Sequence, residues 1–281
     1  QVYRLGQSAG LVDVFPIGAV TQGIQGEHLA EIGAMADSAA RVRVFSDDGN
    51  CVFDPLVMRR ALEYVKKFDG VIAQHAQEPR LTQASQMNEG FVSSQLGLKG
   101  WPAIAEELMV HRDIELVRLT GGRIHFLHLS TQRSVDMVRV AKAQGLAITA
   151  EAAPHHFTLS DESLRSFDTV YKVNPPLRTA LDIQALKDGL ADGTIDAIAT
   201  DHAPHASHLK EQPLDQAPPG MLGLETALAL ALSELTMDVY DVLAALSWKP
   251  AKIAGIDDRH GRPIAVGEPA NITVFNPSVE W

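Results

Sequence analysis

Short apolar runs that alternate with helical patterns constrain the fold of this chain more than any other feature. The clearest runs occupy residues 41–46, 71–73, 123–128 and 195–200. They alternate only weakly between apolar and polar side chains, which is typical of parallel strands buried on both faces. A helical pattern follows each run. This order of elements predicts an α/β fold with a parallel sheet.

Two further runs, 11–20 and 146–152, have the same character and bring the predicted strands to six. A (β/α)8 barrel, or TIM barrel, needs eight strands. We therefore expect residues 1–255 to be a partial TIM barrel with six of its eight strands. Because residues 1–5 have the pattern of a helix interior, the two remaining strands are expected upstream of Gln1.

The last part of the chain has a different pattern. Short alternating stretches at 263–266 and 270–275 are separated by glycine and proline. Such stretches are typical of small β-structure. Residues 256–281 are therefore predicted to be the start of a C-terminal β-rich appendage.

Composition narrows the class of protein. The chain has 281 residues and a formal net charge of −11, which argues against nonspecific nucleic-acid binding because that needs lysine and arginine to neutralise phosphates. It contains no apolar run of about 18 residues and no signal-peptide pattern, so we expect no membrane insertion or export. The single cysteine, Cys51, excludes an internal disulfide framework and suits the cytoplasm.

Four side chains of metal-ligand type stand at the ends of predicted strands: Asp48, His75, His128 and Asp201. Each alone has an ordinary explanation, as a turn residue, a half-buried histidine or a loop cap. The carboxyl ends of barrel strands converge on one face, however, so the four together favour a metal centre. Imidazole and carboxylate ligands favour Zn²⁺ or a similar ion over calcium. A carboxylate such as Asp201 can also accept a proton when a metal activates water.

Seven motifs carry a family resemblance. They are FSDDG at 45–49, H-A-x-E at 75–78, HLS at 128–130, PHH at 154–156, KVNPPLR at 172–178, TDHAPH at 200–205 and PGMLGLET at 219–226. In order and spacing the set resembles the bacterial class I dihydroorotases, which are cyclic amidohydrolases. The resemblance implies a zinc-dependent TIM barrel that interconverts N-carbamoyl-L-aspartate and L-dihydroorotate in pyrimidine (UMP) biosynthesis.

The resemblance also implies roles for the metal ligands, with two zinc ions in each active site. Asp48 matches the carboxylate that bridges the two ions, and His75 and His128 match ligands of the second ion. Asp201 matches a ligand of the first ion and the catalytic base. The family's His-x-His-x-Arg segment, which supplies the other ligands of the first ion, is absent from these residues. We therefore expect residues 1–281 alone to be inactive and the intact protein to be active.

Substrate contacts are implied by the same resemblance. Asn174, His205 and the backbone of Pro219 and Gly220 match groups that hold the substrate ring and its carboxylate. The segment 206–218 is either a mobile lid or an ordinary surface loop.

Two alternatives remain open at this point. One is a hydantoinase or allantoinase, although Asp48 stands where those enzymes generally carry a lysine. The other is an inactive dihydroorotase-like subunit that supports aspartate carbamoyltransferase, against which the retained ligands weigh. Either that enzyme or a second copy of the chain is a candidate partner.

The positions of four further histidines also predict their roles. His155 and His156 end another predicted strand, which leaves a supporting or substrate-facing role open. His202 is expected to support its loop through hydrogen bonds, and His125 is expected to point away from the mouth of the barrel.

Overall fold

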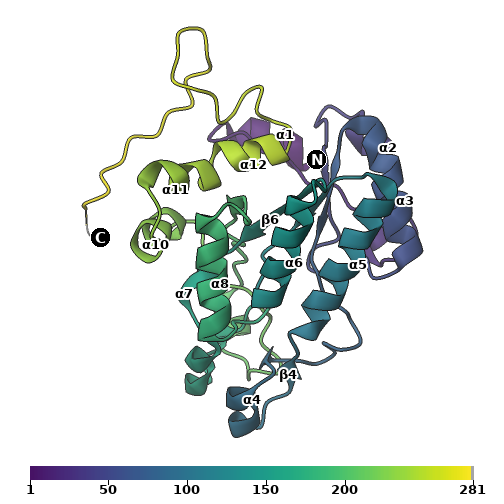
Figure 1. Cartoon of the computed structure of the whole chain (residues 1–281). Coiled ribbons are helices and arrows are strands. Elements are labelled where there is room, and N and C mark those ends of the chain that lie inside the picture. Colours follow the sequence, from purple (N-terminus) through teal and green to yellow (C-terminus); the bar gives the residue numbers. More distant parts are fainter. Residues whose placement is uncertain (280–281) are drawn as a thin grey trace.

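The computed structural model describes residues 1–279 and contains one main parallel sheet (Figure 1). Its strands are β1 (Val44–Phe45), β2 (Val71–Gln74), β5 (Ile124–Phe126), β6 (Ile148–Ala152) and β7 (Ala197–Ile198). They lie side by side in the order β1-β2-β5-β6-β7, and every pair is parallel. A second, two-stranded sheet pairs β3 (Met87–Asn88) with β4 (Gly100–Trp101). The predicted α/β fold with a parallel sheet is confirmed.

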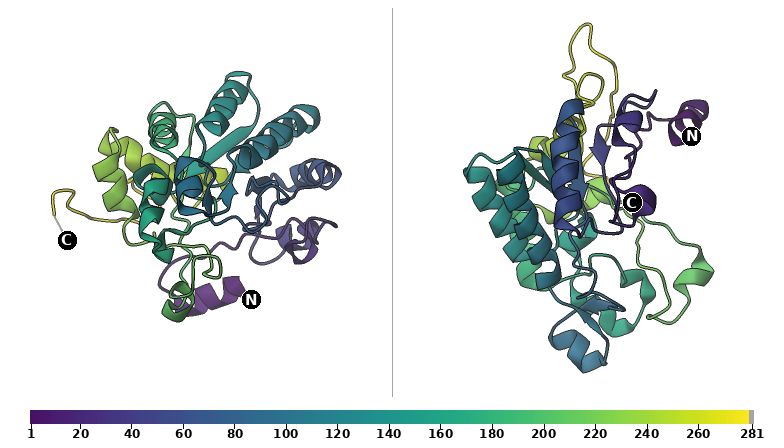
Figure 2. Two further views of the ribbon diagram at one scale, coloured as in Figure 1. Left: turned by 90° about the horizontal axis from the view of Figure 1, so that it is seen from below. Right: turned by 90° about the vertical axis from the view of Figure 1, so that its right-hand side faces the viewer.

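Helices connect the strands and surround the main sheet. The α-helices are α1 (Val2–Ala9), α2 (Ile32–Ala36), α3 (Pro55–Val65), α4 (Phe91–Leu96), α5 (Ile104–Thr120), α6 (Gln132–Ala143), α7 (Pro154–Thr158), α8 (Ala180–Ala191), α9 (Ser207–Lys210), α10 (Ala227–Glu234), α11 (Val239–Leu246) and α12 (Trp248–Ile253). In Figure 2 the helices α3, α5, α6 and α8 fan outward around the strands, and successive helices of this series are in contact. None of the helices within residues 1–279 has both the length and the apolarity needed to cross a bilayer.

Helix α3 illustrates how local sequence and packing agree. The Asp54 side chain accepts hydrogen bonds from the backbone N–H groups of Leu56 and Val57, and Pro55 occupies the first turn. Met58 and Leu62 then face the core and are fully buried. The capping residue and the apolar spacing of the sequence thus account for where this helix begins and which face it buries.

The prediction of a strand at 11–20 is wrong. Only Gly18 joins the sheet there, through one isolated parallel bridge to Phe45. Pro16 has no N–H to donate to a neighbouring strand, and Leu11 and Val12 are exposed rather than buried. The described residues therefore contain five strands of the main sheet, and this sheet does not close on itself.

The strands predicted at 263–266 and 270–275 are also absent from the described residues. Ile264, Val266 and Val274 are almost fully exposed. A short pair of strands without an apolar surface to cover is marginal in water. Whether residues 256–281 begin a separate appendage stays a prediction.

Asp47 ties the segment around Gly18 to the end of β1. Its Oδ1 accepts hydrogen bonds from the backbone N–H groups of Val20 and Thr21, each at 2.9 Å, and its Oδ2 accepts one from the Thr21 hydroxyl. Asp47 and Thr21 are both buried. Asp47 thus has a structural task, and its neighbour Asp48 takes no part in these hydrogen bonds.

Replacing Asp47 with alanine is expected to lower the free energy of unfolding by about 2–4 kcal/mol, because two buried N–H groups lose their acceptor. The matched variant Asp54→Ala, which removes the cap of α3, is expected to cost about 1 kcal/mol. Urea unfolding followed by circular dichroism measures both losses. Equal losses, or a larger loss at Asp54, would contradict the role given to Asp47.

Candidate metal centre

Asp48, His75 and His128 converge in one cluster. Asp48 Oδ1 lies 3.1 Å from His75 Nδ1 and 3.1 Å from His128 Nε2, and the two ring nitrogens lie 3.2 Å apart. Ligands at the usual zinc distance of about 2.0–2.1 Å stand roughly 3.3 Å from one another in a tetrahedron. The three donor atoms therefore have the spacing of ligands that share one metal ion.

The sheet brings these three residues together. His75 directly follows β2, and Asp48 and His128 come a few residues after β1 and β5. Because β1, β2 and β5 are adjacent and parallel, their carboxyl ends lie at the same edge. The structure brings Asp48, His75 and His128 together as predicted. Their role as metal ligands stays a prediction.

A second hydrogen bond orients the His75 ring. Its Nε2 lies 2.7 Å from Gln77 Oε1, and Gln77 Nε2 donates to the Thr82 hydroxyl at 2.6 Å. Since the amide oxygen can only accept, His75 Nε2 carries the proton and Nδ1 keeps its lone pair for the cluster. Gln77 was not among the residues predicted from the sequence. Its position two residues after a predicted ligand is a signal that would have found it.

Charge interactions within the cluster are strong. Burial by itself would raise the pKa of Asp48, but its close contacts with His128 and His75 outweigh burial and hold the pKa well below its ordinary range. Burial opposes protonation of His128, yet the hydrogen bond to Asp48 and its charge raise the pKa of His128 to about 9. A metal ion must displace this proton, so binding is expected to release it.

Asp201 lies near the cluster without joining it. The cluster consists of the three residues whose donor atoms all lie within 4.8 Å of one another, and Asp201 is not among them. Burial raises the pKa of Asp201, and the charges of His128 and Asp48 also act on it. His155 Nε2 lies 3.6 Å from Asp201 Oδ2, and burial lowers the pKa of His155 to about 3, so this ring is neutral.

Two predicted ligands have an unusual backbone. His128 has a φ of 28° and Asp201 a φ of 46°, a left-handed conformation that residues other than glycine rarely adopt. The backbone N–H of His128 donates to Glu151 Oε1 at 3.4 Å. Such strained residues concentrate at functional sites.

Three of the four predicted substrate-binding residues lie together. His205 Nε2 donates to the Pro219 carbonyl at 2.8 Å. Gly220 donates its N–H to the Lys172 carbonyl at 2.9 Å and has a φ of 144°. A Cβ on Gly220 would come within 2.8 Å of His205 Nε2, so only glycine fits here. Asn174 follows Lys172 by two residues, and its buried Oδ1 has no hydrogen-bond partner within the described residues.

The predicted lid segment, 206–218, is held at its far end. Lys210 Nζ donates to the carbonyls of Pro218 and Gly220 at 3.1 and 3.0 Å. Lys172 Nζ donates to the Leu214 carbonyl at 2.6 Å. Both ammonium groups therefore donate hydrogen bonds to backbone carbonyls in this segment or just beyond it, and the motion of the segment as a lid stays a prediction.

For His202 the prediction is confirmed, and for His125 it is wrong. His202 Nδ1 accepts hydrogen bonds from the N–H groups of Gly223 and Leu224 at 3.1 and 3.2 Å, so it supports its loop as expected. The prediction that His125 points away from the mouth is wrong. His125 Nε2 lies 2.9 Å from Glu151 Oε2, on the same carboxylate that receives the His128 N–H.

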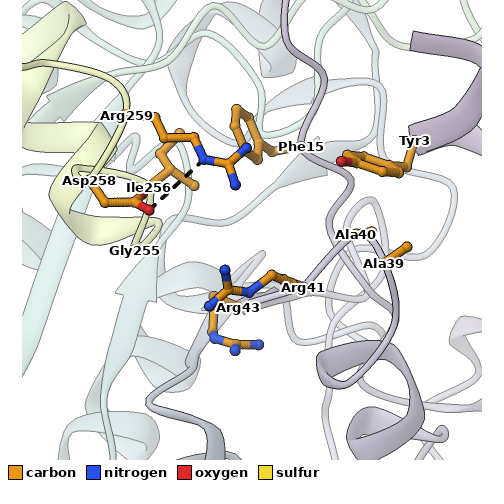
Figure 3. Close-up of a pocket in the computed structure, with 10 residues that line it drawn as sticks. All are labelled: Tyr3, Phe15, Ala39, Ala40, Arg41, Arg43, Gly255, Ile256, Asp258 and Arg259. Carbon is orange, nitrogen blue, oxygen red and sulfur yellow. Dashed lines mark ion pairs between the residues drawn. The ribbon is translucent and has the colours of Figure 1, made fainter. Parts of the chain in front are cut away.

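Another pocket lies at the opposite end of the sheet. Figure 3 shows that Arg41, Arg43, Tyr3 and Arg259 line it. Arg41 and Arg43 precede β1, whereas Asp48 follows it. This pocket is therefore separate from the metal cluster and includes none of the predicted site residues.

The donor set fits a zinc-type ion. It offers one carboxylate oxygen and two imidazole nitrogens, a combination that suits Zn²⁺. One ring already has its second nitrogen bound by Gln77, as metal-ligating histidines generally do. These residues can hold one ion, and the number of ions in the intact protein is not fixed by them.

Replacing Gln77 with leucine is expected to weaken Zn²⁺ binding by about 10–100-fold, since His75 loses the partner that fixes its tautomer. Competition with a chelator of known zinc affinity measures the change. Gln184→Leu, an exposed substitution of the same kind on α8, serves as the control. Unchanged zinc affinity in Gln77→Leu would show that Gln77 does not orient the ligand.

Curated relatives match almost the whole chain. The dihydroorotase of Streptomyces coelicolor is 57% identical over 98% of this chain, and that of Mycobacterium tuberculosis is 51% identical over 100%. This chain covers 65% and 66% of those two proteins. It therefore spans about 65% of the length of the relatives that it matches.

Solved structures of related enzymes share the fold. A D-hydantoinase from Thermus sp. superposes with a TM-score of 0.66 at 26% identity, over 77% of this chain and 50% of that one. A D-hydantoinase from Bacillus sp. AR9 superposes with a TM-score of 0.73 at 20% identity, over 84% of this chain and 56% of that one. The partial coverage agrees with a sheet that contains only part of a barrel. The model of the amidohydrolase family matches residues 21–280, and the chain belongs to this family.

Proposed function

We propose that the protein to which these residues belong is a dihydroorotase. It would catalyse the reversible, zinc-dependent cyclisation of N-carbamoyl-L-aspartate to L-dihydroorotate in pyrimidine biosynthesis. The observation that carries the proposal is the identity of 51–57% to dihydroorotases over nearly the whole chain. Because the chain spans about 65% of those relatives, the proposal concerns the whole protein.

The residues of the cluster have separable tasks in this proposal. Asp48, His75 and His128 would hold the metal, and the family resemblance assigns Asp48 to a centre with two zinc ions. When bound, zinc lowers the pKa of water and polarises a carbonyl oxygen. Asp201 would accept a proton from the attacking water and return it to the ring nitrogen as the ring amide bond breaks. Asp201 lies close enough to His128 and Asp48 for their charges to act on it, and this supports the role.

Substrate binding would fall to the loops beside the cluster. Asn174 and His205 can donate hydrogen bonds to a carboxylate. At Gly220, which has no side chain, the backbone itself can lie close to the substrate. The buried Oδ1 of Asn174 has no partner within the described residues and can only accept, so it would take a hydrogen bond from a substrate N–H while the amide nitrogen donates to the carboxylate. Local donors of this kind allow an acidic protein to bind an acidic ligand.

A hydantoinase is the second candidate, and the superposition on D-hydantoinases favours it. Asp48 opposes it, because the family resemblance places a lysine there in hydantoinases. An inactive subunit that supports aspartate carbamoyltransferase is opposed by the tight spacing of the three donor atoms. We place the reaction in the cytoplasm, which the single cysteine of the chain suits.

The full-length protein is expected to convert N-carbamoyl-L-aspartate to dihydroorotate and to leave hydantoin and allantoin unchanged. Asp201→Asn is expected to lower kcat by about 10²–10⁴-fold, because the proton acceptor is lost. Product formation followed by chromatography measures each reaction. Turnover of hydantoin without turnover of carbamoyl-aspartate would reject the proposal in favour of the second candidate.

A further inference from the structure

Two consecutive histidines begin α7 and are almost completely buried. His155 is 4% exposed and His156 is 2% exposed, and their ring centroids lie 4.3 Å apart. Burying two imidazoles side by side is unfavourable unless their polar atoms have partners. The contacts of each ring therefore indicate what the pair does.

His156 connects α7 to the loop that carries Asn174. Its Nε2 donates to the Pro175 carbonyl at 2.9 Å. Burial lowers the pKa of His156 well below its ordinary value, so this ring is neutral. The short helix is thus fixed relative to the residue that precedes Pro175.

His155 faces the other way, toward Asp201. Its Nε2 is buried and has no hydrogen-bond partner within the described residues, and Asp201 Oδ2 is 3.6 Å away. This separation exceeds a formed hydrogen bond, but a movement of roughly half an ångström would bring it into range. A cavity of about 230 Å³, lined by His155 together with Met221 and Leu222, leaves space beside the ring.

We propose that His155 is a positioning residue, which donates its Nε2–H to Asp201 Oδ2 and so fixes the direction of that carboxylate. Asp201 needs such a partner because its left-handed backbone sets the start of the side chain but not the rotation of the carboxylate. With His156 holding the Asn174 loop, one short helix aligns the proposed base with the proposed substrate amide. The inference deepens the proposed function and rests on it.

The test uses the full-length protein with His155→Leu, which removes the donor, and His155→Gln, which keeps an N–H near the same place. We expect His155→Leu to lower kcat by about 10–100-fold with KM changed less than about threefold, and to weaken the binding of one Zn²⁺ by a similar factor. His155→Gln is expected to restore most of both. Thr158→Val, on the same helix, is the matched control and should leave both unchanged.

The results distinguish a failure of the role given to His155 from a failure of the proposed function. A His155→Leu variant with kcat within about twofold of the wild type would overturn the inference, as would a His155→Gln variant no better than leucine at an equal Tm. If leucine prevents folding, His155→Asn replaces it, because its shorter amide places no N–H at the Nε2 position. If the wild type does not cyclise carbamoyl-aspartate, the proposed function fails, and the Zn²⁺ titrations of the same variants still decide the role of His155.

Discussion

The contact among Asp48 Oδ1, His75 Nδ1 and His128 Nε2 is the constraint on which the rest of the site depends. These three atoms can each bind a proton, and they lie within 3.2 Å of one another. Only a shared cation or shared protons can stabilise such an arrangement. The parallel order of β1, β2 and β5 makes it geometrically available, because side chains far apart in sequence meet where these strands end.

The surrounding residues keep the donor atoms in place. Asp47 fixes the backbone beside Asp48, and Gln77 fixes the tautomer of His75. His128 has a left-handed backbone, a conformation that costs about 1–3 kcal/mol and persists only when neighbouring contacts impose it. Glu151 supplies one such contact. The protein thus tolerates a strained backbone at a residue whose side chain must be oriented, which is typical of a binding or catalytic site.

Sequence reasoning predicted the parts that depend on burial patterns and strand order. The five strands of the main sheet and the meeting of Asp48, His75 and His128 follow from apolar runs and from the residues that end them. The segment 11–20 was misjudged because an apolar run indicates burial, whereas Leu11 and Val12 lie exposed and Pro16 interrupts pairing. Gln77 and the orientation of His125 depend on single hydrogen bonds, which no periodicity encodes.

Locating zinc in a crystal of the full-length protein by anomalous scattering at the zinc edge tests the central claim most directly. The account predicts a peak about 2.0–2.2 Å from Asp48 Oδ1, His75 Nδ1 and His128 Nε2. Zinc bound elsewhere, or bound to His75 through Nε2, would contradict it.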